Sequence, residues 1–338
     1  MRFGTCNIPT RGKDHDRTSQ RRLDLGDLDG PLLFGFGLFD GHGKTAGVAD
    51  LLAERVLDDF VASVRGDAVS PFRDAVASPA AGEGVTAGGL RAEHGGGSAM
   101  AKVAARHLRK AFAAASAAVA EAFEGQRAGS TATAVVVFRD PAVAGLPNQW
   151  GVVCSWVGDS RAVAIAPGGR AVEALTEDHR LGLSRERDRV MKEHAAEAAR
   201  APPGARATVV TVRVCTATGR VGPQVAFNER TGISTTVTRA FGDSLGASAL
   251  TDVPEVAARE GLPDGTRLVV ASDGVWDVLS PKRVAEIVRS VRNPRKAACV
   301  LCDVAKKVRL FGGHSPDDIS ATVVDLGSPA AAALGSSA

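Results

Sequence analysis

Two apolar segments in opposite halves of the chain end in the same way, on an aspartate followed by glycine. The first runs from Leu32 to Asp40 and the second from Leu268 to Asp273. Apolar runs of this length are typical of buried strands, and each is followed by a helical pattern. A single Asp-Gly pair is typical of a turn. Its recurrence at two strand ends instead predicts carboxylates placed to act as metal ligands or catalytic acids.

Two further aspartates fit this arrangement. Asp159 follows a strand-like run over 150–157 and precedes another over 161–166, and Asp317 precedes a final strand at 319–326. Carboxylates that converge in a low-dielectric pocket repel one another unless cations neutralise them. An all-oxygen ligand set favours hard divalent ions, so the pattern predicts Mg²⁺ or Mn²⁺ rather than zinc.

Composition excludes several classes of function. The 41 Lys and Arg residues nearly balance 38 Asp and Glu, and tyrosine is absent, which does not suit a nucleic-acid-binding protein. No apolar segment is long enough to span a bilayer, and Met1–Thr5 does not begin a secretory signal. Five cysteines suit a reducing compartment, so we expect an intracellular protein, cytoplasmic or nuclear. The Cys299-x-x-Cys302 pair is interpreted as two small buried thiols on a helix rather than a zinc or redox site.

Periodicity predicts helices and strands in alternation along the chain. Helices are expected over 44–64, 98–124, 184–200, 281–291 and 294–308, and further strands over 131–138 and 208–216. Residues 65–97 are rich in Ala, Gly, Ser and Pro and are expected to form a low-complexity surface insertion. Residues 219–236 show no clear period and are interpreted as an irregular flap, and the tail at 327–338 is expected to be disordered.

Six short motifs along the chain form a larger pattern. They are Phe39-Asp40-Gly41-His42-Gly43, Gly129-Ser130-Thr131, Val157-Gly158-Asp159-Ser160-Arg161, Thr238-Arg239-Ala240-Phe241-Gly242-Asp243, Ala271-Ser272-Asp273-Gly274-Val275-Trp276-Asp277 and Asp317-Asp318-Ile319-Ser320. In this order they resemble the metal-dependent protein phosphatases of type 2C, the PPM family, and its plant-type members most closely. The resemblance covers Phe3 to Leu326, and a single phosphatase domain over 1–326 is therefore expected.

The resemblance implies an α+β fold: an α-β-β-α sandwich of two mainly antiparallel sheets flanked by helix pairs. It also implies two Mg²⁺ or Mn²⁺ ions that activate a water for in-line hydrolysis of phosphoserine and phosphothreonine in phosphoprotein substrates. The implied metal ligands are Asp40, the Gly41 carbonyl, Asp273, Asp317 and Asp16, with Asp159 and Asp273 able to hold a third, weaker ion. His42 is implied as general acid and Arg11 as the phosphate-binding arginine. We expect a monomer that binds neither nucleic acid nor membrane.

One position departs from the family pattern. An acidic pair usually follows the arginine, and its glutamate helps to hold the second metal, whereas here the pair is His15-Asp16. A neutral imidazole can bind Mn²⁺ but brings no negative charge, so a weaker or manganese-preferring second site is predicted. Asp14 is a possible replacement ligand.

Three other functions were weighed. Gly43-Lys44-Thr45 resembles the end of a nucleotide-binding P-loop, but that motif needs glycine five residues before Gly43, where Leu38 stands. A general metallophosphoesterase usually shows His-rich ligand motifs, which are missing here. The alternative that stays open is a weakened pseudophosphatase acting as a binding protein, because His15 replaces an acid.

Overall fold

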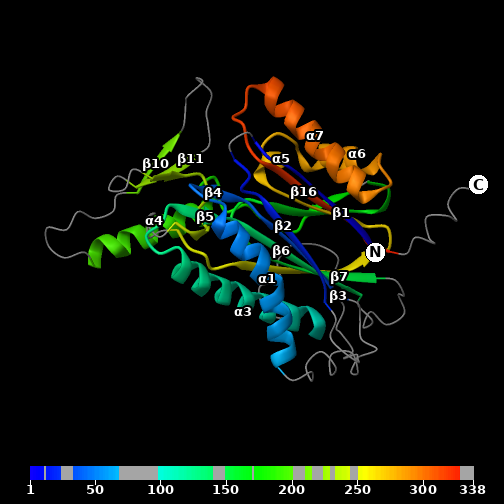
Figure 1. Cartoon of the computed structure of the whole chain (residues 1–338), viewed down its shortest axis with the longest axis horizontal. Coiled ribbons are helices and arrows are strands. Elements are labelled where there is room, and N and C mark those ends of the chain that lie inside the picture. Colours follow the sequence, from blue (N-terminus) through cyan, green and yellow to red (C-terminus); the bar gives the residue numbers. More distant parts are fainter. Residues whose placement is uncertain are drawn as a thin grey trace, which may run out of the picture.

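The computed structural model describes residues 1–10, 13–23, 33–67, 98–139, 149–169, 171–200, 210–214, 224–228, 233–243 and 250–327. Two sheets lie face to face, with α6 (Pro281–Arg289) and α7 (Pro294–Gly312) over one and α1 (Gly47–Gly66) and α3 (Ala99–Ala122) over the other (Figure 1). The expected α-β-β-α sandwich is confirmed.

The first sheet has the strand order β1-β16-β15-β8-β9, and all of its neighbours pair antiparallel. These strands are β1 (Arg2–Ile8), β16 (Ile319–Asp325), β15 (Arg267–Ala271), β8 (Arg161–Ile165) and β9 (Val172–Ala174). The chain's first strand therefore pairs with its last, which brings residues just after β1 next to those just before β16.

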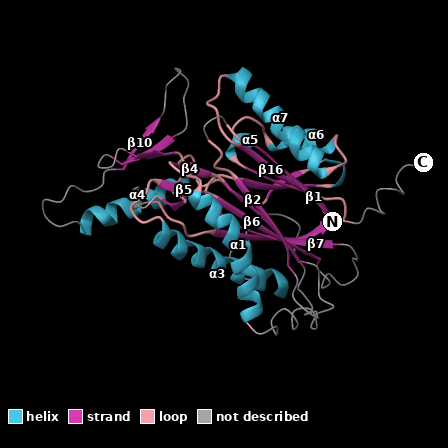
Figure 2. Ribbon diagram, in the orientation of Figure 1, coloured by secondary structure: helices cyan, strands magenta, loops and turns pink. Residues whose placement is uncertain are grey.

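The second sheet has the order β14-β7-β6-β3-β2, again antiparallel throughout. Figure 2 shows the strands of both sheets, in magenta, between the α6–α7 pair and the α1–α3 pair. Its strands are β14 (Glu255–Pro263), β7 (Gln149–Val157), β6 (Ala132–Arg139), β3 (Leu33–Phe39) and β2 (Arg17–Leu23). A small sheet of β13 (Phe241–Gly242), β5 (Ala128–Ser130) and β4 (Gly41–Gly43) lies beyond the end of β3.

Side chains from the facing strands fill the space between the two sheets. Alternate residues of β3 and β6, such as Phe36, Leu38 and Val135, pack with Leu268 and Val324 of the other sheet. Two further cores form where each helix pair covers the outer face of its sheet. Since β3 and β15 are buried on both faces, their sequences are continuously apolar, as the sequence pattern suggested.

Local sequence sets the ends of the helices. The side chain of Ser98 caps α3, Ser280 caps α6 and Asn293 caps α7, each accepting a hydrogen bond from a backbone amide of the first turn. Gly313 ends α7 in the left-handed conformation, at φ 69°. A short helix, α5 (Asp273–Trp276), begins at the second strand-end aspartate. Helix α4 (Ser184–Arg200) has the predicted bounds.

Some sequence-based interpretations need correction. Residues 219–236 are not wholly irregular, because β11 (Gln224–Asn228) and β12 (Ile233–Thr235) form a sheet with β10 (Val210–Val214). These strands are too short to show a period in the sequence. Cys302 is buried as expected, but Cys299 is only half-buried. Most of the expected insertion at 65–97, Arg11 and nearly all of the tail lie outside the described residues. Within the described part, no helix is long and apolar enough to cross a membrane.

Candidate metal centre

Asp40 lies at the centre of a cluster of carboxylates from four separate parts of the chain. It follows β3 directly, and the negative charges of Asp16, Asp273, Asp159 and Asp317 all act on it. Burial and then these four charges raise the pKa of Asp40 well above its ordinary value. The four strand-end aspartates named from the sequence are thus brought together, from the ends of β3 and β7, the start of α5 and the loop before β16. Asp16 joins them from the loop before β2.

Asp16 tests whether these residues suit a cation. Its side chain is 1% exposed, and neither carboxylate oxygen accepts a hydrogen bond of normal geometry, although the hydroxyls of Ser320 and Ser272 lie nearby. Burial is the main reason that the pKa of Asp16 rises to about 6. A buried carboxylate without a donor is costly unless a cation binds it. The donor set therefore fits hard divalent ions.

The backbone at Gly41 also approaches this cluster closely. A Cβ atom at Gly41 would lie 2.7 Å from the carbonyl oxygen of His15, and the Gly41 amide donates to that oxygen at 3.3 Å. Only glycine fits here without moving the His15–Asp16 segment. The Gly41 backbone and the His15–Asp16 segment are therefore held next to each other.

Asp318 anchors the loop between β1 and β2. One of its carboxylate oxygens accepts from the Thr10 amide at 2.6 Å, and the other accepts from the His15 amide at 2.7 Å. Asp318 thereby fixes both flanks of the segment that carries Arg11, and it places Asp16 against Asp40. The side chain of Asp14, the possible replacement ligand, is 61% exposed and lies 3.5 Å from Arg17.

Arg309 on α7 interacts with Asp273 through a hydrogen bond and with Asp317 through an ion pair. Its guanidinium donates to the carbonyl oxygens of Gly274 at 2.8 Å and of Asp273 and Ser315 at 3.0 Å each, and it lies 3.6 Å from the Asp317 carboxylate. Burial raises the pKa values of both aspartates, and the charge of Arg309 opposes this at Asp317. The arginine is buried, so α7 is connected directly to two candidate metal ligands.

The side chain of Asp159 is hydrogen-bonded to an arginine, Arg180. Arg180 donates from Nε to Asp159 at 2.8 Å and from a terminal nitrogen to Asp277 at 2.9 Å, and the same nitrogen lies 3.5 Å from Asp273. Burial raises the pKa of Asp159, and the charge of Arg180 opposes that rise. The guanidinium thus lies between Asp159 and Asp273, the two residues to which the family resemblance assigns a third ion.

His42 is paired with a carboxylate of its own. Its Nε2 lies 2.6 Å from Oδ2 of Asp243, and the imidazole is 36% exposed. Burial alone favours the neutral ring, but the hydrogen bond and charge of Asp243 raise the pKa of His42 above its ordinary value. A Cβ at Gly129 would lie 2.4 Å from Nε2, so this glycine leaves room for the pair.

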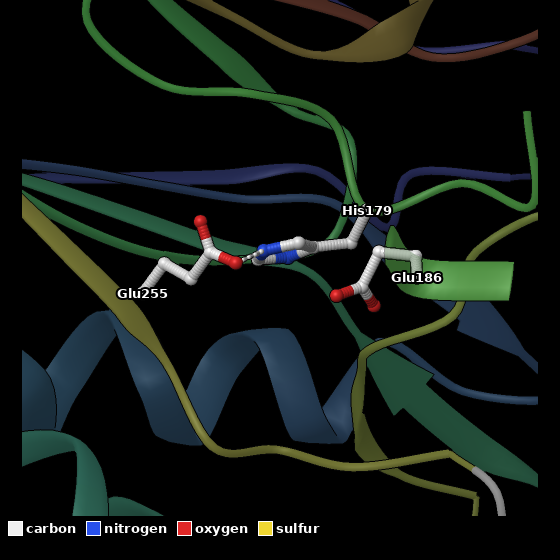
Figure 3. A group of neighbouring side chains, drawn as sticks. All are labelled: His179, Glu186 and Glu255. Carbon is white, nitrogen blue, oxygen red and sulfur yellow. Dashed lines mark ion pairs between the residues drawn. The ribbon is translucent and has the colours of Figure 1, made fainter. Parts of the chain in front are cut away.

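Figure 3 shows a second histidine–carboxylate group close to this centre, made of His179, Glu186 and Glu255. The ring Nδ1 of His179 accepts from the Gly158 amide at 3.0 Å, and Nε2 lies 3.6 Å from Glu255. Both glutamates are ion-paired with Arg239. Glu186 is also ion-paired with Arg189, and Glu255 with Arg185, so arginines balance both negative charges. The group acts as an internal ion network that fixes the turn before Asp159.

A family model described as "Protein phosphatase 2C" matches residues 95–201 and 211–310. The chain belongs to the protein phosphatase 2C family. A curated relative from Arabidopsis thaliana, "Probable protein phosphatase 2C 59", is 26% identical over 99% of this chain and 83% of its own length. "Probable protein phosphatase 2C 3" from Oryza sativa is 30% identical over 60% of this chain, which spans only 35% of that relative.

A solved structure, that of serine-threonine phosphatase 2C from Toxoplasma gondii, has the same fold. It superposes with a TM-score of 0.66 at 20% sequence identity, covering 96% of this chain and 94% of its own. The comparisons agree with the family and the fold that the six motifs suggested.

The structure adds four residues that sequence reasoning did not assign to the site: Arg180, Asp243, Arg309 and Asp318. Asp243 and Asp318 stand inside motifs already quoted, so their neighbourhood carried a signal. Arg309 lies within a helix that has several other bases, and Arg180 stands among charged residues before α4. Nothing in their spacing distinguishes them from surface cations.

Proposed function

We propose that the chain is a metal-dependent protein serine/threonine phosphatase. The observation that carries the proposal is the meeting of the carboxylates of Asp16, Asp159, Asp273 and Asp317 around Asp40, where burial and mutual charge raise the pKa of the central group. Membership of the protein phosphatase 2C family supports the same activity. The substrate class, phosphoserine and phosphothreonine in proteins, follows from the family resemblance.

Two divalent cations, Mg²⁺ or Mn²⁺, are assigned to this cluster. Asp40 and the Gly41 carbonyl, together with Asp16 on one side and Asp273 and Asp317 on the other, are the residues that hold them. When bound, such ions activate a water molecule and neutralise phosphoryl charge. Arg180 already supplies positive charge between Asp159 and Asp273. We therefore place two ions, rather than three, at the centre.

The proton for the leaving alkoxide is assigned to His42. Because its Nε2 is engaged by Asp243, the proton available to a substrate is the one on Nδ1. The raised pKa of His42 favours the protonated ring, which is the form that a general acid needs. The partial exposure of the imidazole lets a phosphate ester reach it.

Phosphate binding is assigned to Arg11, whose forked donors suit two phosphoryl oxygens. The anchoring of Thr10 and His15 on Asp318 supports this assignment, because it holds two residues that flank Arg11 in the sequence next to Asp317 and Asp16. An Arg11→Lys variant keeps the positive charge but loses the paired N–H donors of the guanidinium. We expect it to raise KM for a phosphopeptide more than it lowers Mn²⁺ affinity.

The test is hydrolysis of a phosphothreonine peptide and of p-nitrophenyl phosphate with Mn²⁺, with Mg²⁺ and with EDTA. Wild-type protein should hydrolyse both substrates with either metal and neither with EDTA. Asp273→Asn should abolish activity, whereas Asp188→Asn, which removes a 76% exposed carboxylate on α4, should not. A folded wild type that binds Mn²⁺ but hydrolyses neither substrate would instead support the pseudophosphatase alternative.

A further inference from the structure

Three of the chain's cysteines meet where the first strand crosses the last helix. Cys6 lies on β1, and Cys299 and Cys302 lie one turn apart on α7, which covers that part of the sheet (Figure 1). Cys302 belongs to the buried core under α7, and the half-buried Cys6 packs against this core. From the sequence the C-x-x-C pair was interpreted as two small buried thiols rather than a zinc or redox site, but the fold brings a third thiol to it from nearly 300 residues away.

The backbones of β1 and α7 are in close contact where the two elements cross. A Cβ at Gly4 would lie 2.2 Å from the Cα atom of Arg295, so the backbone of β1 lies directly against the first turn of α7. Further along the same interface, Sγ of Cys302 is 3.8 Å from the carbonyl oxygen of Cys6. The Cys6 thiol is also within hydrogen-bond reach of both Cys302 and Cys299. The sulfur atoms of Cys6 and Cys302 are thus held together by two elements that cannot easily separate.

The two sulfurs differ in reactivity. The hydrogen bond from Cys302 is the largest cause that lowers the pKa of Cys6 to about 6, with smaller help from Cys299 and Arg295. The same bond to Cys6, together with burial, raises the pKa of Cys302. Cys6 is therefore the thiol that more readily forms a thiolate and reacts first. Cys302 stays protonated beside it and can react with the oxidised Cys6.

We propose that Cys6 and Cys302 form a reversible disulfide when the protein meets a hydroperoxide. The Cys6 thiolate attacks one peroxide oxygen and breaks the O–O bond, which gives a sulfenic acid and hydroxide. The Cys302 sulfur then attacks the Cys6 sulfur, the S–S bond forms, and the sulfenic oxygen leaves as water with the proton of Cys302. With hydrogen peroxide, the hydroxide takes up the proton that Cys6 lost, so two thiols and one hydrogen peroxide give one disulfide and two waters. A dithiol reductant reverses the reaction.

Both bridged elements end at the candidate metal centre. Beyond Cys6, β1 leads to Thr10, whose amide donates to Asp318 and whose hydroxyl donates to the carbonyl of Asp317. Beyond Cys302, α7 leads to Arg309, which donates to the carbonyl of Asp273. A disulfide fixes the two sulfur atoms about 2 Å apart and so constrains how strand and helix lie against each other. We expect the oxidised protein to bind Mn²⁺ more weakly, by severalfold.

The test is oxidation of the reduced full-length protein with hydrogen peroxide, followed by alkylation, proteolysis and mass spectrometry. The expected product is a peptide pair joined through Cys6 and Cys302, lighter than the two reduced peptides by two hydrogen atoms, and lost on treatment with dithiothreitol. Cys6→Ser and Cys302→Ser must each lack it. Cys299→Ser is the matched control, because it leaves both reacting sulfurs in place and should still form the pair. Buried Cys154, whose pKa burial raises to about 12, should be alkylated only after unfolding.

Two results overturn the proposal: a disulfide between Cys299 and Cys302 in place of the expected pair, or Cys6 that stays reduced or goes on to sulfinic acid without bridging. The consequence for the metal centre is measured by calorimetric Mn²⁺ titration of reduced, oxidised and re-reduced protein. Equal affinities in all three would refute the coupling. These readouts do not depend on hydrolysis, so they remain decisive whether or not the protein proves to be an active phosphatase.

Discussion

Replacing Asp16 with asparagine should stabilise the metal-free protein while it weakens metal binding. The side chain is 1% exposed, and its pKa rises from 3.8 to about 6 in the folded protein. At about 1.4 kcal/mol per pKa unit, the folded state is destabilised by about 3 kcal/mol once the group is ionised. Because a buried amide also needs partners, we expect a net gain of about 1–3 kcal/mol for Asp16→Asn at pH 7.5.

The sign of the pH dependence follows from the raised pKa. Below pH 3.8 the carboxyl is protonated in both the folded and the unfolded protein, and the charge costs nothing. Stability is lost as the pH rises from there through about 6, where the folded protein also loses the proton. The stability difference between the variant and wild type should therefore widen by about 2 kcal/mol between pH 4.5 and pH 7.5.

The assay is urea unfolding in EDTA at both pH values, with Asp188→Asn as the control for removing one exposed carboxylate. Repeating it with Mn²⁺ at about 100 times the Kd should stabilise wild type by about 2.7 kcal/mol and the variant by much less. A variant that is less stable than wild type without metal at pH 7.5, or a difference that does not change with pH, would refute this reasoning.

Other variants test separate parts of the site. Asp243→Asn should lower the pKa of His42 and move the alkaline limb of the kcat profile to lower pH. Gly41→Ala, whose Cβ would meet the His15 carbonyl at 2.7 Å, should weaken Mn²⁺ binding about 10–100-fold by calorimetry. His15→Glu should raise Mg²⁺-supported activity, and no gain would contradict the weak second site. Arg309→Ala should lower the free energy of unfolding by about 1–3 kcal/mol, because it leaves the buried carbonyl oxygen of Gly274 without its donor.

Individual strands could be predicted from the sequence where they are long and apolar, whereas the α-β-β-α arrangement was expected only because of the family resemblance. The strand before Asp40 and the strand before Asp273 are buried on both faces, so their patterns are unambiguous. Strands with a polar face were missed, as at β2 and β14 (Glu255–Pro263), where charged residues interrupt the alternation. The ion network around Glu186 depends on arginines from distant segments, so no local sequence pattern predicts it.

The ligand set could be named only because the family resemblance supplies an order for motifs that are each modest. What the sequence could not show is how the ligands are supported. Asp318 was assigned no role from the sequence, yet each of its carboxylate oxygens accepts a hydrogen bond from a backbone amide. Arg180 reads as a surface charge, yet it fills the space between Asp159 and Asp273. These roles depend on three-dimensional proximity between residues far apart in the chain.

The central claim is that Asp16, Asp40, Asp273 and Asp317 together hold a pair of divalent cations. Crystals soaked in Mn²⁺ and measured at the manganese absorption edge test it directly. We predict two anomalous peaks beside the Asp40 carboxylate, one toward Asp16 and the other toward Asp273 and Asp317, with Arg180 still paired to Asp159. An anomalous map without a peak within coordination distance of Asp40 would contradict it.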